Sequence, residues 1–321
     1  MTTFADFTRS DFNADQLADI LWRDQAGDDV LWLMNNNTAG TIVPLPHVTP
    51  DWHFKAAAEF DKSSNGDADI LWQNDNGALA LWQMSNIGVN AIAALPNPGP
   101  SWHVVGDNDF DGDNTDDIFF QNDNGALAMW TGITTMGTVF GMFASTQDPG
   151  PTWHVVGTGA TDGLSHAGIL WQNNNGALAV WTKPTFGPGT FTFNAVAALP
   201  TVDASWHVKG LADFNGQGNG TADVVFQNDN GAVAIWEMGG AAGTTINAMN
   251  LININPGPAW HIVGLRDMDG DVKKDIVFQN DNGAAAVWED YRSLGGGSAT
   301  FDTVLAITPN PNPNGHVWDL L

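Results

Sequence analysis

The sequence has no cysteine and few basic residues. Its 321 residues include 10 Lys and Arg against 36 Asp and Glu, which gives a formal net charge of −26. Without cysteine there can be no disulfide, no thiolate nucleophile and no Cys-ligated zinc. Because a phosphate backbone has to be neutralised by Lys and Arg, the composition excludes ordinary nucleic-acid binding and argues against docking on anionic lipid.

Long hydrophobic runs are also missing. No apolar stretch approaches the roughly 18 residues of a membrane span, so we expect no membrane insertion. The segment from Met1 to Asp11 has no basic region followed by an apolar one, so we expect no Sec-type signal peptide. Hydrophobic residues nevertheless make up 43% of the chain and charged ones 14%, which predicts a folded core rather than an acidic disordered tail.

A strong internal repeat dominates what the sequence does contain. The segment from Asp69 to Trp82 reads DILWQNDNGALALW. Similar segments lie at 117–130, 168–181, 223–236 and 275–288, and a degenerate copy lies at 19–32. A second marker, Trp-His, begins at Trp52, Trp102, Trp153, Trp206 and Trp260, and a degenerate copy lies at Gly315-His316. Markers that recur at about fifty residues are typical of the blades of a β-propeller.

Each repeat is predicted to form four short strands, which we name A to D. Strand A starts at the Trp-His marker, as in 102–106, and strands B, C and D follow as in 70–73, 78–82 and 91–95. The Asn-Gly step between strands B and C is a strong hairpin signal. The aromatic residues of strands B and C are predicted to fill the core between neighbouring sheets.

The repeats predict one all-β domain over 1–321, a six-bladed β-propeller of four-stranded blades. The chain enters just before a strand B and ends with a lone strand A, so residues 316–321 are predicted to complete the first blade and close the ring. We number the repeats as units 1 to 6, with the approximate bounds 1–48 plus 316–321, 51–98, 101–149, 152–200, 205–255 and 259–310.

The loop between strands A and B, the A–B loop, carries carboxylates at alternate positions. In unit 3 it reads DFDGDNTDD from Asp109 to Asp117. Oxygens at positions 1, 3, 5 and 9 with a backbone carbonyl at 7 suit a hard cation of the size of calcium (Ca²⁺), whereas Mg²⁺ needs a stiffer, more hydrated octahedron. A solvated acidic turn without metal is the alternative. The predicted ligands are Asp11, Asn13, Asp15, Leu17 (carbonyl) and Asp19 in unit 1, Asp109, Asp111, Asp113, Thr115 (carbonyl) and Asp117 in unit 3, and Asp267, Asp269, Asp271, Lys273 (carbonyl) and Asp275 in unit 6.

The remaining A–B loops depart from this pattern. Those of units 2 and 5 are longer and carry fewer charges, so they are predicted to bind calcium weakly. The loop of unit 4 keeps a single carboxylate and is predicted to bind none. The weaker candidates are Asp61, Ser63, Asn65 and Asp69 in unit 2, and Asp213, Asn215, Gln217 and Asp223 in unit 5.

The acidic loop followed by Asp-Ile and a hydrophobic strand, as at Asp117-Ile118, resembles the FG-GAP/VCBS repeat of integrin α-chain propellers and bacterial secreted proteins. It is also similar to the calcium-binding propeller lectins of fungi and bacteria. The resemblance spans essentially the whole chain and departs at the A–B loops of units 2, 4 and 5. It implies a propeller with calcium in the loops joining the first two strands of a blade, an extracellular setting and a binding rather than catalytic role.

The hairpins between strands B and C, the B–C hairpins, are predicted to lie at the other rim beside the Trp-His pairs. Amide and carboxylate groups next to an indole suit a sugar, because they bond its hydroxyls while the ring covers its C–H face. Turn chemistry alone also accounts for Asn-Asp-Asn-Gly, and the Trp could be a core wedge. The candidate sugar ligands are Asn74, Asp75, Asn76, Asn122, Asp123, Asn124, Asn173, Asn174, Asn175, Asn228, Asp229, Asn230, Asn280, Asp281 and Asn282, with Trp52, His53, Trp102, His103, Trp153, His154, Trp206, His207, Trp260 and His261.

These features together predict a multivalent lectin whose partners are glycans or glycoproteins, with avidity arising from repeated weak sites. The alternative is an extracellular adhesion or protein-interaction propeller without sugar specificity. We predict no enzymatic activity, because residues that break the repeat, such as His166, Lys183 and Arg266, form no nucleophile–base or paired-acid arrangement. Secretion is expected from the resemblance. The absence of cysteine and of a Sec-type signal fits export by a C-terminal signal, a cytoplasmic protein or a truncated chain.

Overall fold

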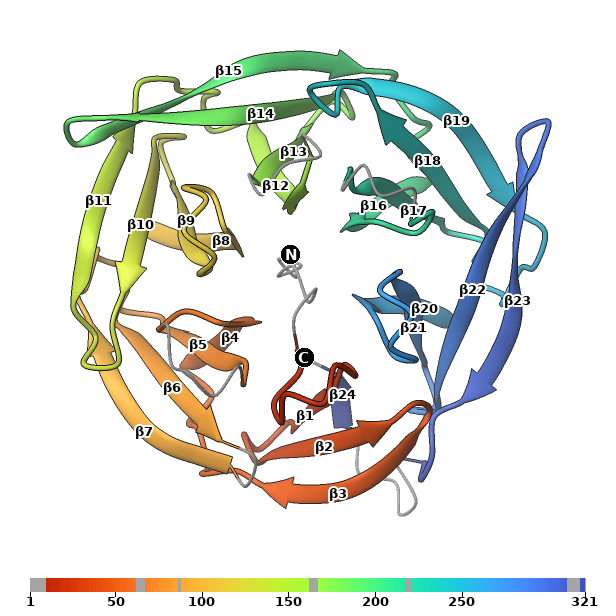
Figure 1. Ribbon diagram of the computed structural model, residues 1–321, viewed down its shortest axis with the longest axis horizontal. Coiled ribbons are helices and arrows are strands. Elements are labelled where there is room, and N and C mark those ends of the chain that lie inside the picture. Colours follow the sequence, from red (N-terminus) through yellow and green to blue (C-terminus); the bar gives the residue numbers. More distant parts are fainter. Residues whose placement is uncertain are drawn as a thin grey trace.

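The computed structural model describes residues 10–61, 67–85, 88–161, 167–216, 221–310 and 318–320. Every regular element in these ranges is a β-strand, so the all-β part of the prediction is confirmed. Figure 1 shows the strands as a ring of sheets, with strand A of each unit innermost and strand D on the outer wall. This arrangement is that of a β-propeller. Within the described residues, no helix is long and apolar enough to cross a membrane.

The strands follow the repeat, and each unit contributes consecutive antiparallel neighbours. Units 1 to 3 contain β1 (Ile20–Asp24), β2 (Asp29–Asn35), β3 (Thr38–Pro44), β4 (Trp52–Ala58), β5 (Asp69–Asn74), β6 (Leu79–Ser85), β7 (Gly88–Leu95), β8 (Trp102–Asn108), β9 (Asp117–Asn122), β10 (Leu127–Ile133) and β11 (Val139–Ser145). Units 4 to 6 contain β12 (Trp153–Ala160), β13 (Ala167–Asn173), β14 (Leu178–Gly187), β15 (Thr190–Leu199), β16 (Trp206–Ala212), β17 (Asp223–Asn228), β18 (Val233–Gly239), β19 (Thr245–Ile252), β20 (Trp260–Arg266), β21 (Asp275–Asn280), β22 (Ala285–Gly295) and β23 (Ser298–Ala306), and the last strand is β24 (Trp318–Leu320).

Hydrogen bonds divide these strands differently from the separate four-stranded sheets that the sequence predicted. Two sheets have four strands, in the orders β24-β1-β2-β3 and β4-β5-β6-β7, and two have eight. In each eight-stranded sheet a short parallel pairing joins two antiparallel runs, between β11 and β15 and between β19 and β23. The physical reason is hairpin length: β14 and β15 have 10 residues each, so their tip reaches the outer strand of unit 3.

The ring is closed by the two ends of the chain. Strand β24 pairs antiparallel with β1, with Leu320 opposite Trp22. This is the predicted closure for residues 318–320, while residues 316, 317 and 321 of that prediction lie outside the described residues. Next to this seam, the buried Arg266 of unit 6 donates from Nη1 to the carbonyl of Asp19 in unit 1 at 2.7 Å.

The hydrophobic core lies between neighbouring units. Each cluster of buried apolar residues draws on two adjacent units, including one that joins unit 6 to unit 1. In every unit an aromatic residue of strand B contacts the Trp of strand C, with ring centroids between 4.6 Å for Phe226–Trp236 and 5.3 Å for Trp72–Trp82. These aromatic residues therefore hold the ring together, as the sequence predicted.

Candidate functional site

The A–B loop of unit 3 gathers three carboxylates at one point. Oxygens of Asp109, Asp111 and Asp117 all lie within 4.8 Å of one another. The bend that brings them together uses left-handed backbone at Gly112 (φ 80°) and Asn114 (φ 66°). The N–H groups of these two residues donate to the Asp109 carboxylate at 2.7 and 2.9 Å. The backbone thus fixes an acidic loop with its carboxylates turned inward.

Asp117 has no exposed surface, and Asp109 is buried as well. The Oδ2 of Asp117 accepts the N–H of Phe110 at 2.8 Å, whereas its Oδ1 has no hydrogen-bond partner among the described residues. Burial, followed by the charge of Asp111, raises the pKa of Asp117 to about 9. An ionised carboxylate here lacks compensation, and a bound cation would supply it.

The A–B loop of unit 6 has the same form. Oxygens of Asp267, Asp269 and Asp271 lie within 4.8 Å of one another. Gly270 (φ 83°) and Val272 (φ 65°) occupy the two left-handed positions that Gly112 and Asn114 occupy in unit 3. The shared register that the sequence predicted for these two loops therefore gives the same backbone bend in both.

The last ligand position of the unit 6 loop is also buried. Asp275 accepts the N–H of Met268 at 2.8 Å, and burial raises the pKa of Asp275 to about 8. Unlike the unit 3 loop, this loop carries an internal countercharge, because Lys273 Nζ donates to Asp271 at 2.7 Å. That amine neutralises one of the carboxylates and leaves the others for a cation.

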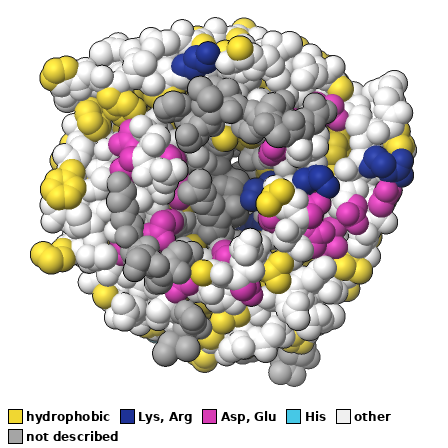
Figure 2. Space-filling view, viewed as in Figure 1, with side chains coloured by type: hydrophobic (Ala, Val, Ile, Leu, Met, Phe, Trp, Pro, Cys, Tyr) yellow, Lys and Arg dark blue, Asp and Glu magenta, His cyan; other side chains and the backbone are white. Residues whose placement is uncertain are grey.

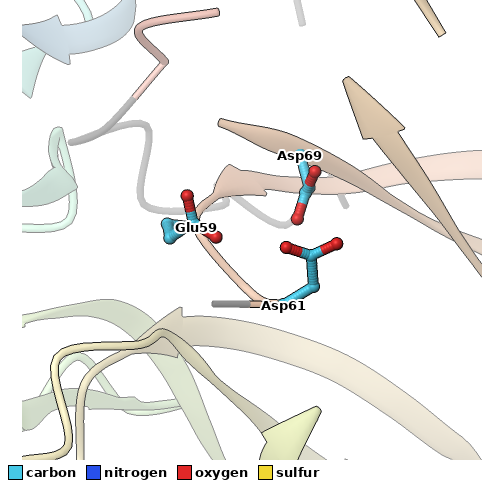
Figure 3. Close-up of side chains that lie close together, drawn as sticks. All are labelled: Glu59, Asp61 and Asp69. Atoms are coloured by element: carbon cyan, nitrogen blue, oxygen red, sulfur yellow. The ribbon is translucent and has the colours of Figure 1, made fainter. Parts of the chain in front are cut away.

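The A–B loop of unit 2 brings together Glu59, Asp61 and Asp69, again within 4.8 Å (Figure 3). Asp69 is 1% exposed, and in the part of the chain that the structure describes its Oδ2 has no hydrogen-bond partner. Asp61 and Asp69 were predicted from the sequence, whereas Glu59, which takes the first loop position that Asp109 takes in unit 3, was not. The signal was present in the matching order Glu-Phe-Asp and Asp-Phe-Asp. The two other candidates of this loop, Ser63 and Asn65, lie outside the described residues.

The A–B loop of unit 1 shares the motif and the backbone bend, with Ala14 (φ 56°) and Gln16 (φ 72°) at the two left-handed positions, but its carboxylates are arranged differently. Its described residues form no group of three convergent carboxylates. Asp19 accepts the N–H of Phe12 at 2.7 Å and that of Met34 at 2.7 Å, so both of its oxygens are occupied. Asp11 accepts N–H groups of the loop itself, including that of Gln16 at 2.8 Å. This loop meets its own hydrogen-bond needs more fully than that of unit 3.

The A–B loops of units 5 and 4 differ again. In unit 5, Asn215 Nδ2 donates to Asp223 at 3.2 Å, and Asp213 accepts the N–H of Gly216 at 3.0 Å. Gln217, the remaining candidate there, lies outside the described residues, as do residues 162–166 of the unit 4 loop. The described part of unit 5 therefore offers an amide where units 2, 3 and 6 offer a carboxylate.

The chemistry of the three convergent groups fits a hard divalent cation. All their ligand atoms are carboxylate oxygens, and Ca²⁺ takes six to eight oxygen ligands in flexible geometry. Figure 2 shows the molecule from the side of Figure 1, with separate groups of Asp and Glu side chains at several places around the centre of the ring. Asp117 and Asp69 each keep a buried oxygen that no described residue satisfies, which is the observation that favours a cation over a solvated turn.

The B–C hairpins form the opposite rim, and their repeated residues are bonded within the protein. In unit 5, Asn228 Nδ2 donates to Ser205 Oγ at 2.7 Å, and Asn230 Oδ1 accepts the N–H of Ala232 at 2.9 Å. Gly231 has a φ of 91°, as the turn requires. Equivalent bonds recur in units 2, 3 and 4. Turn structure thus accounts for the first and third Asn of the motif.

The Gln that precedes each hairpin joins one unit to the next. Gln227 Nε2 donates to the carbonyl of Trp260 at 2.6 Å, and its Oε1 accepts the N–H of Ile262 at 3.0 Å. Gln73 makes the same two bonds to unit 3, at 2.8 and 3.0 Å. In unit 1, Arg23 stands in the Gln position and donates to the carbonyl of Trp52 at 3.0 Å. The role of this residue in joining one unit to the next was not predicted from the sequence.

The middle residue of each hairpin meets the His of the Trp-His marker. In units 2 to 6 a His Nε2 lies 2.7–2.8 Å from the Oδ1 of the hairpin Asp or Asn, in the pairs His53–Asp75, His103–Asp123, His154–Asn174, His207–Asp229 and His261–Asp281. Each of the four His side chains that pair with an Asp is about half exposed. The neighbouring Trp residues are half-buried against the inter-unit cores. The His–Asp and His–Asn pairs therefore contribute exposed polar groups to this rim.

A cavity of about 750 Å³ lies at the hairpin rim, between units 3, 4 and 5. Its polar lining includes His103, His154 and Asp203, and its apolar lining includes Val155 and Trp206. The cavity thus brings a Trp ring, imidazoles and carboxylates from three units to one space. Of the predicted sugar ligands it gathers His103, Asn122, Asp123, His154, Asn173, Asn174, Asn175, Trp206 and His207.

The linker between units 4 and 5 explains why this region is open. In units 2, 3 and 5 a Cβ on the hairpin glycine would collide with the backbone of the next Pro-Gly-Pro linker, as Gly125 would with Gly150. At Gly176 of unit 4 the nearest atom would be Thr201 Cγ2, 3.9 Å away. The unit 4 linker, which reads TVDAS from Thr201 to Ser205, therefore does not fill the space above its hairpin.

Comparisons with known proteins give no family and no function for this chain. No family model matches the chain, and no curated protein matches it. One similar solved structure is a crystal structure of the mitotic checkpoint complex, with a TM-score of 0.47 and 12% identity over 93% of this chain and 79% of that chain. Another is a crystal structure of BBS1N in complex with ARL6DN, soaked with mercury, with a TM-score of 0.46 and 10% identity over 89% of this chain and 93% of that chain. At these identities neither structure carries information on function.

Proposed function

We propose that this protein is a six-bladed, calcium-binding β-propeller, related to FG-GAP/VCBS repeats, whose hairpin rim binds carbohydrate. Six blades of four strands are supported by the antiparallel runs of each unit and by the cores between neighbours. The parallel pairings of β11 with β15 and of β19 with β23 are then contacts between blades rather than parts of them. The pairing of β24 with β1 supports closure of the ring.

Calcium in the A–B loops is proposed to be structural. Asp109, Asp111 and Asp117 would hold one ion in unit 3, with a second ion in unit 6 and a third in unit 2. A bound divalent cation supplies the positive charge that these buried carboxylates lack. Because binding to the folded state stabilises it by mass action, the effect is greatest where free calcium is millimolar, which fits a secreted, extracellular protein.

The cavity at the hairpin rim is the observation that carries the carbohydrate proposal. A sugar needs an apolar surface for its C–H face and fixed polar groups for its hydroxyls. Trp206 and Val155 supply the first, while His103, His154 and Asp203 supply the second. Because His154 is bonded to Asn174 and is therefore oriented, it would meet a hydroxyl without further ordering. The cavity favours a main site at units 3 to 5, with weaker sites at the other hairpins.

The test is a glycan-binding screen followed by titration of any hit into the wild-type protein and two variants. Trp206→Ala should weaken binding by about tenfold or more, because it removes the apolar wall of the cavity. Trp260→Ala is the matched control, since Trp260 opens β20 as Trp206 opens β16 and does not line the cavity. Equal losses in both variants would contradict a main site at units 3 to 5. A chain that retains no glycan would contradict the lectin proposal.

A protein-interaction propeller is the second candidate, and the outer wall favours it. The outermost strands β3, β7, β11, β15, β19 and β23 carry one charged residue, Asp302, which Arg292 neutralises at 2.8 Å. Large apolar side chains stand exposed on this wall, led by Phe140 at 80%. Figure 2 shows such side chains at the periphery of the ring. If this surface is the functional one, Phe140→Asp should abolish binding of a protein partner, whereas Trp206→Ala should not.

A further inference from the structure

The residue that follows the strand C Trp reaches the A–B loop of its own unit. In unit 2, Gln83 Nε2 donates to Asp61 Oδ2 at 2.6 Å. In unit 3, the hydroxyl of Thr131 bonds to Asp111. Asp61 and Asp111 both occupy the third loop position, so this register of strand C faces the same ligand in both units. In each case a neutral donor meets the carboxylate.

In unit 6 this register holds a carboxylate instead. Glu289 is 3% exposed, and its Oε1 has no hydrogen-bond partner in the part of the chain that the structure describes. The Glu289 carboxylate interacts electrostatically with those of Asp269 and Asp271, and with that of Asp275. Asp269 is again the third loop position. Buried carboxylates that face one another require a cation or a shared proton between them.

Unit 5 shows that an acid at this register need not be unsatisfied. Glu237 is the equivalent residue and is also buried. Its Oε1 accepts hydrogen bonds from Asn250 Nδ2 at 2.8 Å and from the Tyr291 hydroxyl at 2.9 Å. Glu289 Oε1 has no such donors among the described residues. The charges nearest to Glu289 are instead the carboxylates of its own unit.

We propose that Glu289 is a ligand of the cation held by the unit 6 loop, contributed by strand C rather than by the loop itself. The inference rests on the calcium part of the proposed function. The loop alone offers Asp267, Asp269, Asp271, Asp275 and the carbonyl of Lys273, and one further protein oxygen suits the six to eight that Ca²⁺ takes.

The first experiment is a crystal structure of the full chain grown with Ca²⁺. The expected result is an ion in the unit 6 loop with a Glu289 oxygen at about 2.3–2.6 Å from it. An ion in that loop with both Glu289 oxygens beyond about 3 Å would overturn the inference and leave the calcium proposal intact. An ion in the unit 3 loop but none in unit 6 would also overturn the inference alone. Loops without ions in all units would refute the calcium proposal itself.

The second experiment is calorimetric titration of Ca²⁺ into variants. Glu289→Gln should weaken one site by about tenfold or more and leave the others unchanged. Asp302→Asn is the control, because it removes the same charge from an exposed position of the same sheet and should change the affinity by less than about twofold. Unchanged binding by Glu289→Gln would overturn the inference and would indicate a shared proton.

A further pair of variants keeps the test usable if Glu289→Gln fails to fold. Glu289→Thr places the unit 3 residue type in unit 6 and should lower the affinity there. Thr131→Glu makes the reverse exchange and should tighten the unit 3 site by about tenfold. If Thr131→Glu leaves calcium binding unchanged while the protein stays folded, the strand C register does not contribute a ligand.

Discussion

The two rims of the ring are built from the same residue types. At one rim some of these residues lack hydrogen-bond partners, and at the other rim their partners are present. At the A–B loops, Asp117 and Asp69 keep buried oxygens that no described residue satisfies. At the B–C hairpins, the Gln, Asn and Asp residues of the repeat are bonded to backbone, to linker side chains or to His. The difference teaches that repetition alone does not indicate a ligand. An unmet hydrogen-bond or charge requirement is the stronger sign, because only an added partner can satisfy it.

Removing calcium is expected to have the largest effect, and it acts on the A–B loops only. A site that is filled at about a hundred times its dissociation constant contributes about 2.7 kcal/mol to stability. With several such sites, chelation should lower the melting temperature by roughly 5 °C or more. Calorimetry with and without a chelator measures it, and re-addition of Ca²⁺ is the control. An unchanged transition would count against calcium in these loops.

The pH dependence of the calcium-free protein is the next expected effect. Burial raises the pKa of Asp117 to about 9 and that of Asp69 to about 8, both above the ordinary value of 3.8. The folded state therefore binds more protons than the unfolded state between about pH 4 and pH 9, so its stability should fall as the pH rises through this window.

Urea unfolding in chelator at pH 5 and pH 8 measures this dependence. The same comparison in saturating Ca²⁺ should show a much smaller fall, since the cation binds the ionised carboxylates. Stability that rises with pH in chelator would show that the carboxylates are not buried as described.

The smallest expected effects separate two residues of one hairpin. Gln227→Ala should destabilise the fold by about 2–3 kcal/mol, because it breaks two buried bonds between units 5 and 6. Asp229→Asn, two residues along the chain, should cost less than about 1 kcal/mol, since its His207 partner is exposed. Urea midpoints at fixed calcium measure both. Equal costs would mean that the hairpin, not the Gln bridge, joins the units.

The positions of the loops and hairpins at the two rims were easier to predict from the sequence than the hydrogen bonds of individual side chains. The repeat located every strand, and alternate carboxylates located the loops that converge in units 3 and 6. It did not distinguish the unit 1 loop, where the N–H of Met34 on β2 occupies Asp19. In unit 3 the corresponding stretch of β10 contains Gly132 with left-handed backbone, and Asp117 Oδ1 stays without a described partner. The N–H of Met84 makes the same bond to Asp69 in unit 2 at 3.1 Å, and the carboxylates of that loop do converge. Neither this bond nor the spacing of the loop residues therefore predicts convergence by itself.

The strand pairing on the outer wall and the cavity could not be predicted from the sequence, for similar reasons. The joining of β15 to β11 depends on how far a hairpin extends over its neighbour, which the repeat pattern does not encode. The cavity arises because the Thr201–Ser205 linker lacks Pro-Gly-Pro and leaves Gly176 uncrowded. Both features come from departures in a single unit, whereas the repeat reports only what the units share.

The parallel pairings on the outer wall make the seams between units unequal. Units 3 and 4, and units 5 and 6, share backbone hydrogen bonds in addition to side-chain packing. The seam between units 6 and 1 has its own backbone hydrogen bonds, at the Thr38–Thr308 bridge and from the N–H of Ala18 to the carbonyl of Asp267 at 2.8 Å. The strand that completes the first unit at this seam, β24, has only three residues. Amide exchange should therefore be slowest within the two joined pairs, and opening of the ring should begin where the ends of the chain meet.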